Sequence, residues 1–159
     1  MSAARAAAAA VAAALLLGGC SVGDRLNTVK QEAGKAVLPS IAIGACTNLD
    51  LGTSDVATEV DQIPPVPCDK PHGWEAYAEK QFGIDDAFPG DAVLAGEAEQ
   101  YCVDSFEGYV GADYDTSSLE MQYLYPTEQS WTRLVDRTIT CLVGTPALDL
   151  VGSVKGSGK

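Results

Sequence analysis

Alternation of apolar and polar side chains predicts several β-strands along this chain. Residues 119–125 and 138–143 both have a period of two residues, which is typical of a strand with one buried face. The positions expected to face the core are Leu119, Met121, Tyr123, Tyr125, Ile139, Cys141 and Val143. Residues 73–82 predict another strand, with Trp74, Ala76 and Ala78 on one face and Glu75, Tyr77 and Glu79 on the other. Short strands are also expected within residues 41–49 and 148–154.

A helical period replaces the alternation after Pro89 and Gly90. Asp91 is a predicted N-cap, because its side chain can accept a hydrogen bond from the first turn. Gly111 can end the helix in the left-handed conformation. One stripe of this helix is expected to face the core, and it consists of Leu94, Ala98, Tyr101, Cys102, Ser105 and Tyr109. Cys102 is therefore predicted to be buried.

The predicted elements follow one another as two strands, one long helix and three strands. This order favours the α+β class, in which helices pack against one face of an antiparallel sheet. We therefore predict a small antiparallel sheet packed against one main helix, in a single domain.

An export signal is predicted at the N-terminus. Arg5 precedes twelve consecutive apolar residues, Ala6 to Leu17, a run typical of a signal peptide and shorter than a membrane span of about 20 residues. The run ends in Leu-Gly-Gly-Cys, which resembles a bacterial lipobox. We predict a lipoprotein signal peptide over residues 1–19 and attachment of diacylglycerol and palmitate-type acyl chains to Cys20. The alternative is an ordinary signal peptide in which the cysteine occurs by chance.

Residues 20–40 are predicted to be a linker between the lipid and the folded domain. Apolar residues recur there at helical spacing, so a short amphipathic helix is an alternative to an extended spacer, although Gly34 and Pro39 limit its length. The folded domain is expected over residues 41–155, and residues 156–159 are predicted to be a flexible tail. The expected location is the outer face of the cytoplasmic membrane, with the membrane contacted through the lipid.

Four cysteines remain once Cys20 is assigned to lipid, and an even number in an exported chain is typical of disulfides. Of the three pairings that four cysteines allow, we predict Cys46 with Cys68 and Cys102 with Cys141. The second bridge would join the helix to the sheet. Neighbouring cysteines in this set are at least 22 positions apart, so the close pairs of zinc ribbons and thioredoxin-like sites are missing.

The charge of the chain excludes one class of partner. Loss of Arg5 with the signal leaves 9 of the 10 basic residues against 22 acidic residues, a net charge of −13. Nucleic-acid phosphates and anionic lipid headgroups repel such a surface. We therefore expect no nucleic acid as a partner.

His72 is the single histidine of the sequence. Its neighbours Asp69 and Glu75 do not complete a spacing such as H-x-x-x-H or H-E-x-x-H, so neither a metal nor a cofactor is predicted. A structural role is expected, in which the imidazole binds a backbone carbonyl or Glu75. The combination of His72 with Ser130 and Asp136 lacks a G-x-S-x-G elbow, so we predict that the protein is not an enzyme.

A second group of candidate residues consists of Trp131, Arg137, Tyr123 and Tyr125. One interpretation is an aromatic core with a buried or half-buried ion pair between Asp136 and Arg137. The other is a recognition patch, because tryptophan, tyrosine and arginine are enriched where proteins bind partners.

Several short motifs of this chain occur together in a known family. They are Gly44-Ala45-Cys46, the segment from Cys68 through His72 to Glu75, AEQYCVDSFEGYVG, Tyr125-Pro126-Thr127, Ser130-Trp131, and Asp136-Arg137 followed by Cys141. In this combination, over about residues 43–154, the chain resembles the septum-formation domain of exported and membrane proteins of actinobacteria. The family pattern has a Gly-Asp-Arg turn after the tryptophan. Here the segment Leu134–Arg137 lacks the glycine and is one residue longer.

The resemblance implies a role in division or envelope biogenesis and names no reaction. We therefore expect a non-enzymatic, lipid-anchored interaction module outside the membrane, with an unknown envelope or septal protein as partner. The alternative is a lipoprotein that binds a small ligand or an envelope lipid between helix and sheet.

Overall fold

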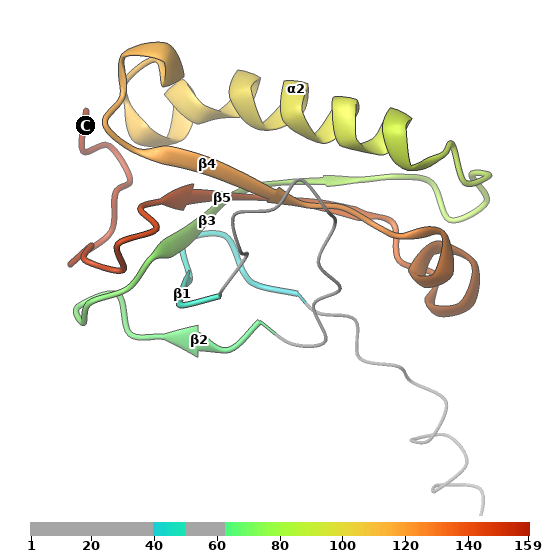
Figure 1. Ribbon diagram of the computed structural model, residues 1–159, viewed down its shortest axis with the longest axis horizontal. Helices are drawn as coiled ribbons and strands as arrows, with labels where there is room; N and C mark the ends of the chain where they lie inside the picture. The colour runs from blue at the N-terminus through green and yellow to red at the C-terminus, as the bar shows by residue number, and fades with distance from the viewer. Residues whose placement is uncertain (1–39, 50–62) are drawn as a thin grey trace, which may run out of the picture. The chain divides into compact units, whose positions relative to one another are not determined.

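The computed structural model describes residues 40–49 and 63–159 (Figure 1). The predicted signal peptide, Cys20 and the linker up to residue 39 lie outside the described residues. Among the described residues, no helix is both long enough and apolar enough to cross a bilayer.

Five strands form one antiparallel sheet in the order β2-β1-β3-β5-β4. The strands are β1 (Cys46–Thr47), β2 (Pro65–Val66), β3 (Trp74–Gln81), β4 (Glu120–Leu124) and β5 (Thr138–Gly144). The helix α2 (Asp91–Val110) lies along one face of the sheet (Figure 1). A 3₁₀ turn η1 (Tyr114–Thr116) and a π-helical turn η2 (Ser130–Leu134) precede β4 and β5. The predicted α+β class is confirmed.

The core between α2 and the sheet consists of side chains from the predicted helical stripe and from the predicted inward positions of the strands. The fully buried side chains of α2 include Leu94, Ala98, Cys102, Phe106 and Val110, and Tyr109 is nearly buried. The predicted inward positions of β4 and β5 pack against them. Tyr101 is half-buried and packs against this core, as predicted, whereas Ser105 is half-buried and its hydroxyl donates to the carbonyl of Tyr101. Phe106, which the prediction omitted, is fully buried, and a side chain of this size contributes about 1.5–3 kcal/mol to stability.

The ends of α2 differ in how well the sequence predicted them. Gly111 has φ 84°, and its amide donates to the carbonyl of Glu107, so it ends the helix as expected. The prediction for Asp91 was wrong. Gly90 is the N-cap, Asp91 is already the first helical residue, and no side chain caps the turn.

A β-bulge changes the predicted faces of β3. Its register against β5 shifts between Ala76 and Ala78, so that Ala78 lies opposite Cys141. Paired residues point to the same side of a sheet. Ala78 therefore faces α2 together with Tyr77, and the expected alternation with Trp74 and Ala76 fails at this position.

Trp74 and Ala76 face the opposite side of the sheet. There they form a second small core with Ile41, Ile63 and Leu142. Both faces of the central strands are consequently buried. This explains why Leu142, on the outward side of the alternation, is as buried as its neighbours.

Two predicted strands are much shorter than expected. Within residues 41–49 only Cys46 and Thr47 have strand conformation, because Gly44 has φ 86° and the amide of Ala45 donates to the carbonyl of Ala42 in a turn. Within residues 148–154 only Leu150 pairs, in an isolated bridge with His72. Leu148 at φ 55° and Gly152 at φ 85° interrupt the extended conformation there.

The segment after Val154 contacts the C-terminal end of α2. The amide of Gly156 donates to the carbonyl of Tyr109, and the amide of Gly158 donates to that of Val110. The Ser117 hydroxyl donates to the carbonyl of Lys159. The predicted tail is therefore attached to the helix by hydrogen bonds.

Both predicted disulfides are present. Cys46–Cys68 joins β1 to the loop before β3, with a Cα–Cα distance of 5.4 Å. Cys102–Cys141 joins α2 to β5, with a Cα–Cα distance of 5.5 Å.

Candidate functional site

Glu75 is a fully buried carboxylate on β3 that accepts three hydrogen bonds. Oε1 accepts from the Tyr109 hydroxyl and from the Ser153 hydroxyl, both at 2.6 Å. Oε2 accepts from the backbone amide of Val154 at 2.7 Å. A buried charge is tolerated when donors of this kind replace water. The carboxylate therefore ties β3, α2 and the segment after Leu150 together.

The environment of Glu75 also affects Tyr109. Burial raises the pKa of the Tyr109 hydroxyl above its usual value of about 10, and the hydrogen bond to Glu75 raises it further. The hydroxyl is therefore a permanent donor to the carboxylate at neutral pH.

His72 is fully buried immediately before β3. Its amide donates to the carbonyl of Leu150, whose amide donates back, and Nδ1 lies 2.8 Å from the carbonyl of Lys70. A carbonyl can only accept, so Nδ1 carries the proton. Nε2 is buried and has no hydrogen-bond partner within residues 40–49 and 63–159. The expected bond from the imidazole to a backbone carbonyl is thus present.

Cys46 completes a group that the sequence did not indicate. It lies directly opposite Glu75 on the neighbouring strand. Its Sγ, one ring nitrogen of His72 and one carboxylate oxygen of Glu75 lie within 4.8 Å of one another. We call these three buried residues the β1–β3 cluster. Sulfur, imidazole and carboxylate are all zinc ligands, but the sulfur is here bonded to Cys68.

Trp131 and Arg137, predicted as candidates for recognition, lie against each other. The guanidinium is 4.0 Å from the centre of the indole ring, and Nη1 donates to the carbonyls of Trp131 and Asp136 at 2.8 Å. The indole is 2% exposed, packs against Phe82 and Phe88, and donates from Nε1 to a backbone carbonyl. These contacts give the indole a packing role.

The ion pair considered for Asp136 and Arg137 is not formed. Arg137 contacts the carbonyl of Asp136, whereas the carboxylate accepts from the Ser130 hydroxyl at 3.1 Å and from the amide of Thr138. The carboxylate therefore fixes the turn that leads from η2 into β5.

The turn between η2 and β5 contains Val135 at φ 60° and ψ 32°. This left-handed conformation is rare for a β-branched residue and costs roughly 1–2 kcal/mol. Val135 therefore adopts, under strain, a conformation in which glycine would be relaxed.

Tyr123 and Tyr125, the other two recognition candidates, are half-buried at the end of β4. Their ring centres are 6.1 Å apart. Burial raises the pKa of the Tyr123 hydroxyl, and the neighbouring Glu99 adds to the shift. Both rings pack against the core between α2 and the sheet.

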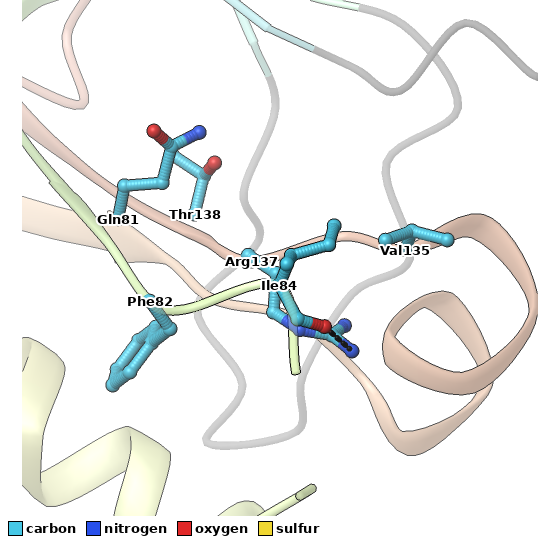
Figure 2. Close-up of a pocket in the computed structure, with 6 residues that line it drawn as sticks. All are labelled: Gln81, Phe82, Ile84, Val135, Arg137 and Thr138. Atoms are coloured by element: carbon cyan, nitrogen blue, oxygen red, sulfur yellow. Dashed lines mark hydrogen bonds between the residues drawn. The ribbon is translucent and has the colours of Figure 1, made fainter. Parts of the chain in front are cut away.

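A cluster of exposed apolar side chains lies where β3 ends and η2 joins β5. Ile84, Leu134 and Val135 are 65%, 41% and 48% exposed, and we call them the η2 patch. Two of them, Ile84 and Val135, line an open pocket of about 320 Å³, which is shown in Figure 2 together with its other lining residues, Gln81, Phe82, Arg137 and Thr138. Figure 2 also shows Arg137 reaching the carbonyl of Ile84, at 3.3 Å. This patch was not predicted from the sequence, because the exposure of apolar side chains depends on tertiary packing.

Comparison with known proteins identifies the domain. A family described as "Septum formation" matches residues 43–157. No curated protein and no solved structure shows a significant match. The matched range covers all the described strands and α2, and it includes both the β1–β3 cluster and the η2 patch.

Proposed function

This chain belongs to the septum-formation family, and from that premise we propose that it is a non-enzymatic interaction module that acts in septum formation or envelope assembly. In this proposal Cys20 carries the lipid and holds the domain on the outer face of the cytoplasmic membrane. The lipobox-like residues Leu17–Cys20 support the anchor. The two disulfides support an oxidising location.

The observation that carries the proposal is the η2 patch. Exposed apolar residues that adjoin one another are typical of protein contact sites. Strained backbone and π-helical turns also occur preferentially at functional sites, and here Val135 and η2 coincide with the patch. Asp85 and Asp86 are exposed beside Ile84. The matching partner surface is therefore apolar with a basic rim.

The buried polar groups support a non-enzymatic role. His72 and Glu75 are both fully buried, and Glu75 already accepts three hydrogen bonds. In the folded, oxidised protein a substrate would have to displace core side chains to reach them. Their contacts fit the structural role that the sequence suggested for this pair.

The alternative of a ligand between helix and sheet has weaker support. The described part of that interface is filled by buried side chains, among them Tyr77, Phe106 and Val143. The pocket of Figure 2 lies at the end of β3 instead.

The test is the substitution Leu134→Asp in a fluorescently tagged full-length protein produced in its native cells. We expect loss of enrichment at the septum, because a charge in the patch opposes burial against a partner. The matched control is Val151→Asp, since Val151 is 64% exposed and follows Leu150, which pairs with His72 before the start of β3, whereas the η2 patch lies beyond the end of β3.

Both variants are expected to melt within a few degrees of the wild type, because exposed substitutions usually change stability by about 0.5 kcal/mol or less. Equal septal enrichment of both variants and the wild type would remove the patch from the proposal. An even distribution of the wild-type protein around the cell would remove the septal role. Intact mass of the mature protein tests the lipid on Cys20 separately.

A further inference from the structure

The pairing of β1 with β3 brings metal-ligand side chains together at one point. Cys46 and Glu75 are directly opposite each other on antiparallel strands, a relationship that places Cβ atoms about 4.5–5.5 Å apart on the same face. His72 approaches from the start of β3, and the three ligand atoms lie within 4.8 Å of one another. This spacing suits ligands that converge on one ion.

His72 has the hydrogen bonding of a metal-binding histidine. Nδ1 bonds the Lys70 carbonyl and fixes the tautomer, which leaves the lone pair on the buried, unpartnered Nε2. Zinc-bound histidines typically donate their other ring nitrogen to a carbonyl or carboxylate in this way. A buried nitrogen without a partner calls for an explanation, and a metal supplies one.

The hydrogen bonds of Glu75 orient its carboxylate and leave one acceptor position open for a metal. Oε1 takes two donors, whereas Oε2 takes only the amide of Val154. A carboxylate has about four acceptor positions, so Oε2 retains a free lone pair. The bonds from Tyr109 and Ser153 would orient the carboxylate as outer-shell contacts do at known sites.

We propose that opening the Cys46–Cys68 disulfide converts the β1–β3 cluster into a site for a divalent transition metal, with Zn²⁺ as the preferred ion. A dithiol or phosphine reductant supplies two electrons and is itself oxidised, and each sulfur takes up one proton. Zinc binding then releases these protons to solvent. The four ligands are Cys46, Cys68, His72 and Glu75, which is the number that a tetrahedral structural zinc site requires.

This disulfide is the more accessible of the two. Cys68 is half-buried, whereas Cys46, Cys102 and Cys141 are fully buried. A reductant must reach a sulfur to open the bond, so mild reduction opens Cys46–Cys68 first. The Cys102–Cys141 disulfide can then hold α2 against the sheet while Cys46–Cys68 is reduced and zinc binds.

The experiment uses the purified protein without a polyhistidine tag. The sample is reduced with a phosphine, exchanged under nitrogen into metal-free buffer and supplied with Zn²⁺, and native mass spectrometry counts the bound ions. We expect one zinc per reduced chain and none per oxidised chain. His72 is the single histidine of the sequence, so zinc binding must also shift the one set of imidazole NMR signals.

Two variants separate this site from simple thiol binding. His72→Gln removes a ligand at similar volume and should weaken zinc binding by about 100-fold or more, whereas Tyr109→Phe removes an outer-shell bond and should weaken it by about 10-fold. Absence of zinc from the reduced chain, or equal affinity in His72→Gln, would overturn the proposal. Should His72→Gln fail to fold, unshifted imidazole signals in the zinc-treated wild type would overturn it equally.

Discussion

Removing the Cys102–Cys141 bridge by the double substitution Cys102→Ala and Cys141→Ala should destabilise the domain strongly. The bridge closes a loop with a sequence separation of 39. The chain-entropy relation for such a loop gives a loss of about 4 kcal/mol at 25 °C. Both sulfurs are fully buried between α2 and β5, so the space that they leave adds to the loss. A domain of this size has a total stability of about 5–15 kcal/mol.

Urea unfolding followed by tryptophan fluorescence and circular dichroism measures the effect. The matched control is the pair Cys46→Ala and Cys68→Ala, whose separation of 22 gives a smaller expected loss of about 3.4 kcal/mol. Either variant should have a larger m-value than the wild type, because its unfolded chain is less constrained. A loss below about 1 kcal/mol for the Cys102 and Cys141 variant, in a folded protein, would refute the assignment of this bridge as the main tie between helix and sheet.

Three further predictions concern single side chains. Tyr109→Phe deletes a bond to a buried carboxylate and should lower the free energy of unfolding by about 1.5–3 kcal/mol in urea titrations at pH 7; an unchanged midpoint would mean that Glu75 finds another donor. Burial raises the pKa values of Tyr77 and Tyr109, so above about pH 10 the folded state keeps hydroxyl protons that the unfolded chain loses. Thermal melts should therefore show that stability falls as the pH rises above about 10, and the fall should be less steep in Tyr109→Phe. Val135→Gly should raise the free energy of unfolding by about 0.5–1 kcal/mol, since relief of left-handed strain exceeds the entropy cost of glycine; destabilisation by thermal melting would contradict the strain argument.

The sequence was most informative where one periodicity determines burial. Strands β4 and β5 have one face toward α2, and their alternation predicted Met121, Ile139 and Cys141 correctly. The same argument failed at Ala78, because a bulge is a property of the strand pair and not of the strand alone. It also overextended the segment around Leu150, where left-handed residues break the strand.

The candidate sites depended on contacts between distant residues. Cys46 and Glu75 are brought together by strand register, which their positions in the sequence do not indicate. Trp131 was assigned from composition to an aromatic core or to a recognition patch, and its burial shows that its ring belongs to the core. The exposed residues nearby, Leu134 and Val135, carried no chemical signature that a sequence motif could detect.

The bond between Glu75 and the amide of Val154 has a consequence for the order in which the protein can fold. The ribosome makes the carboxylate 79 residues before it makes the amide that binds it. Until Ser153 and Val154 are available, the Tyr109 hydroxyl is the one of its three donors that the carboxylate can have, so burying the charge between β3 and α2 is less favourable. We therefore expect the sheet and α2 to reach their native packing only after the last residues of the domain are available, with apolar surface open to chaperones and to aggregation until then.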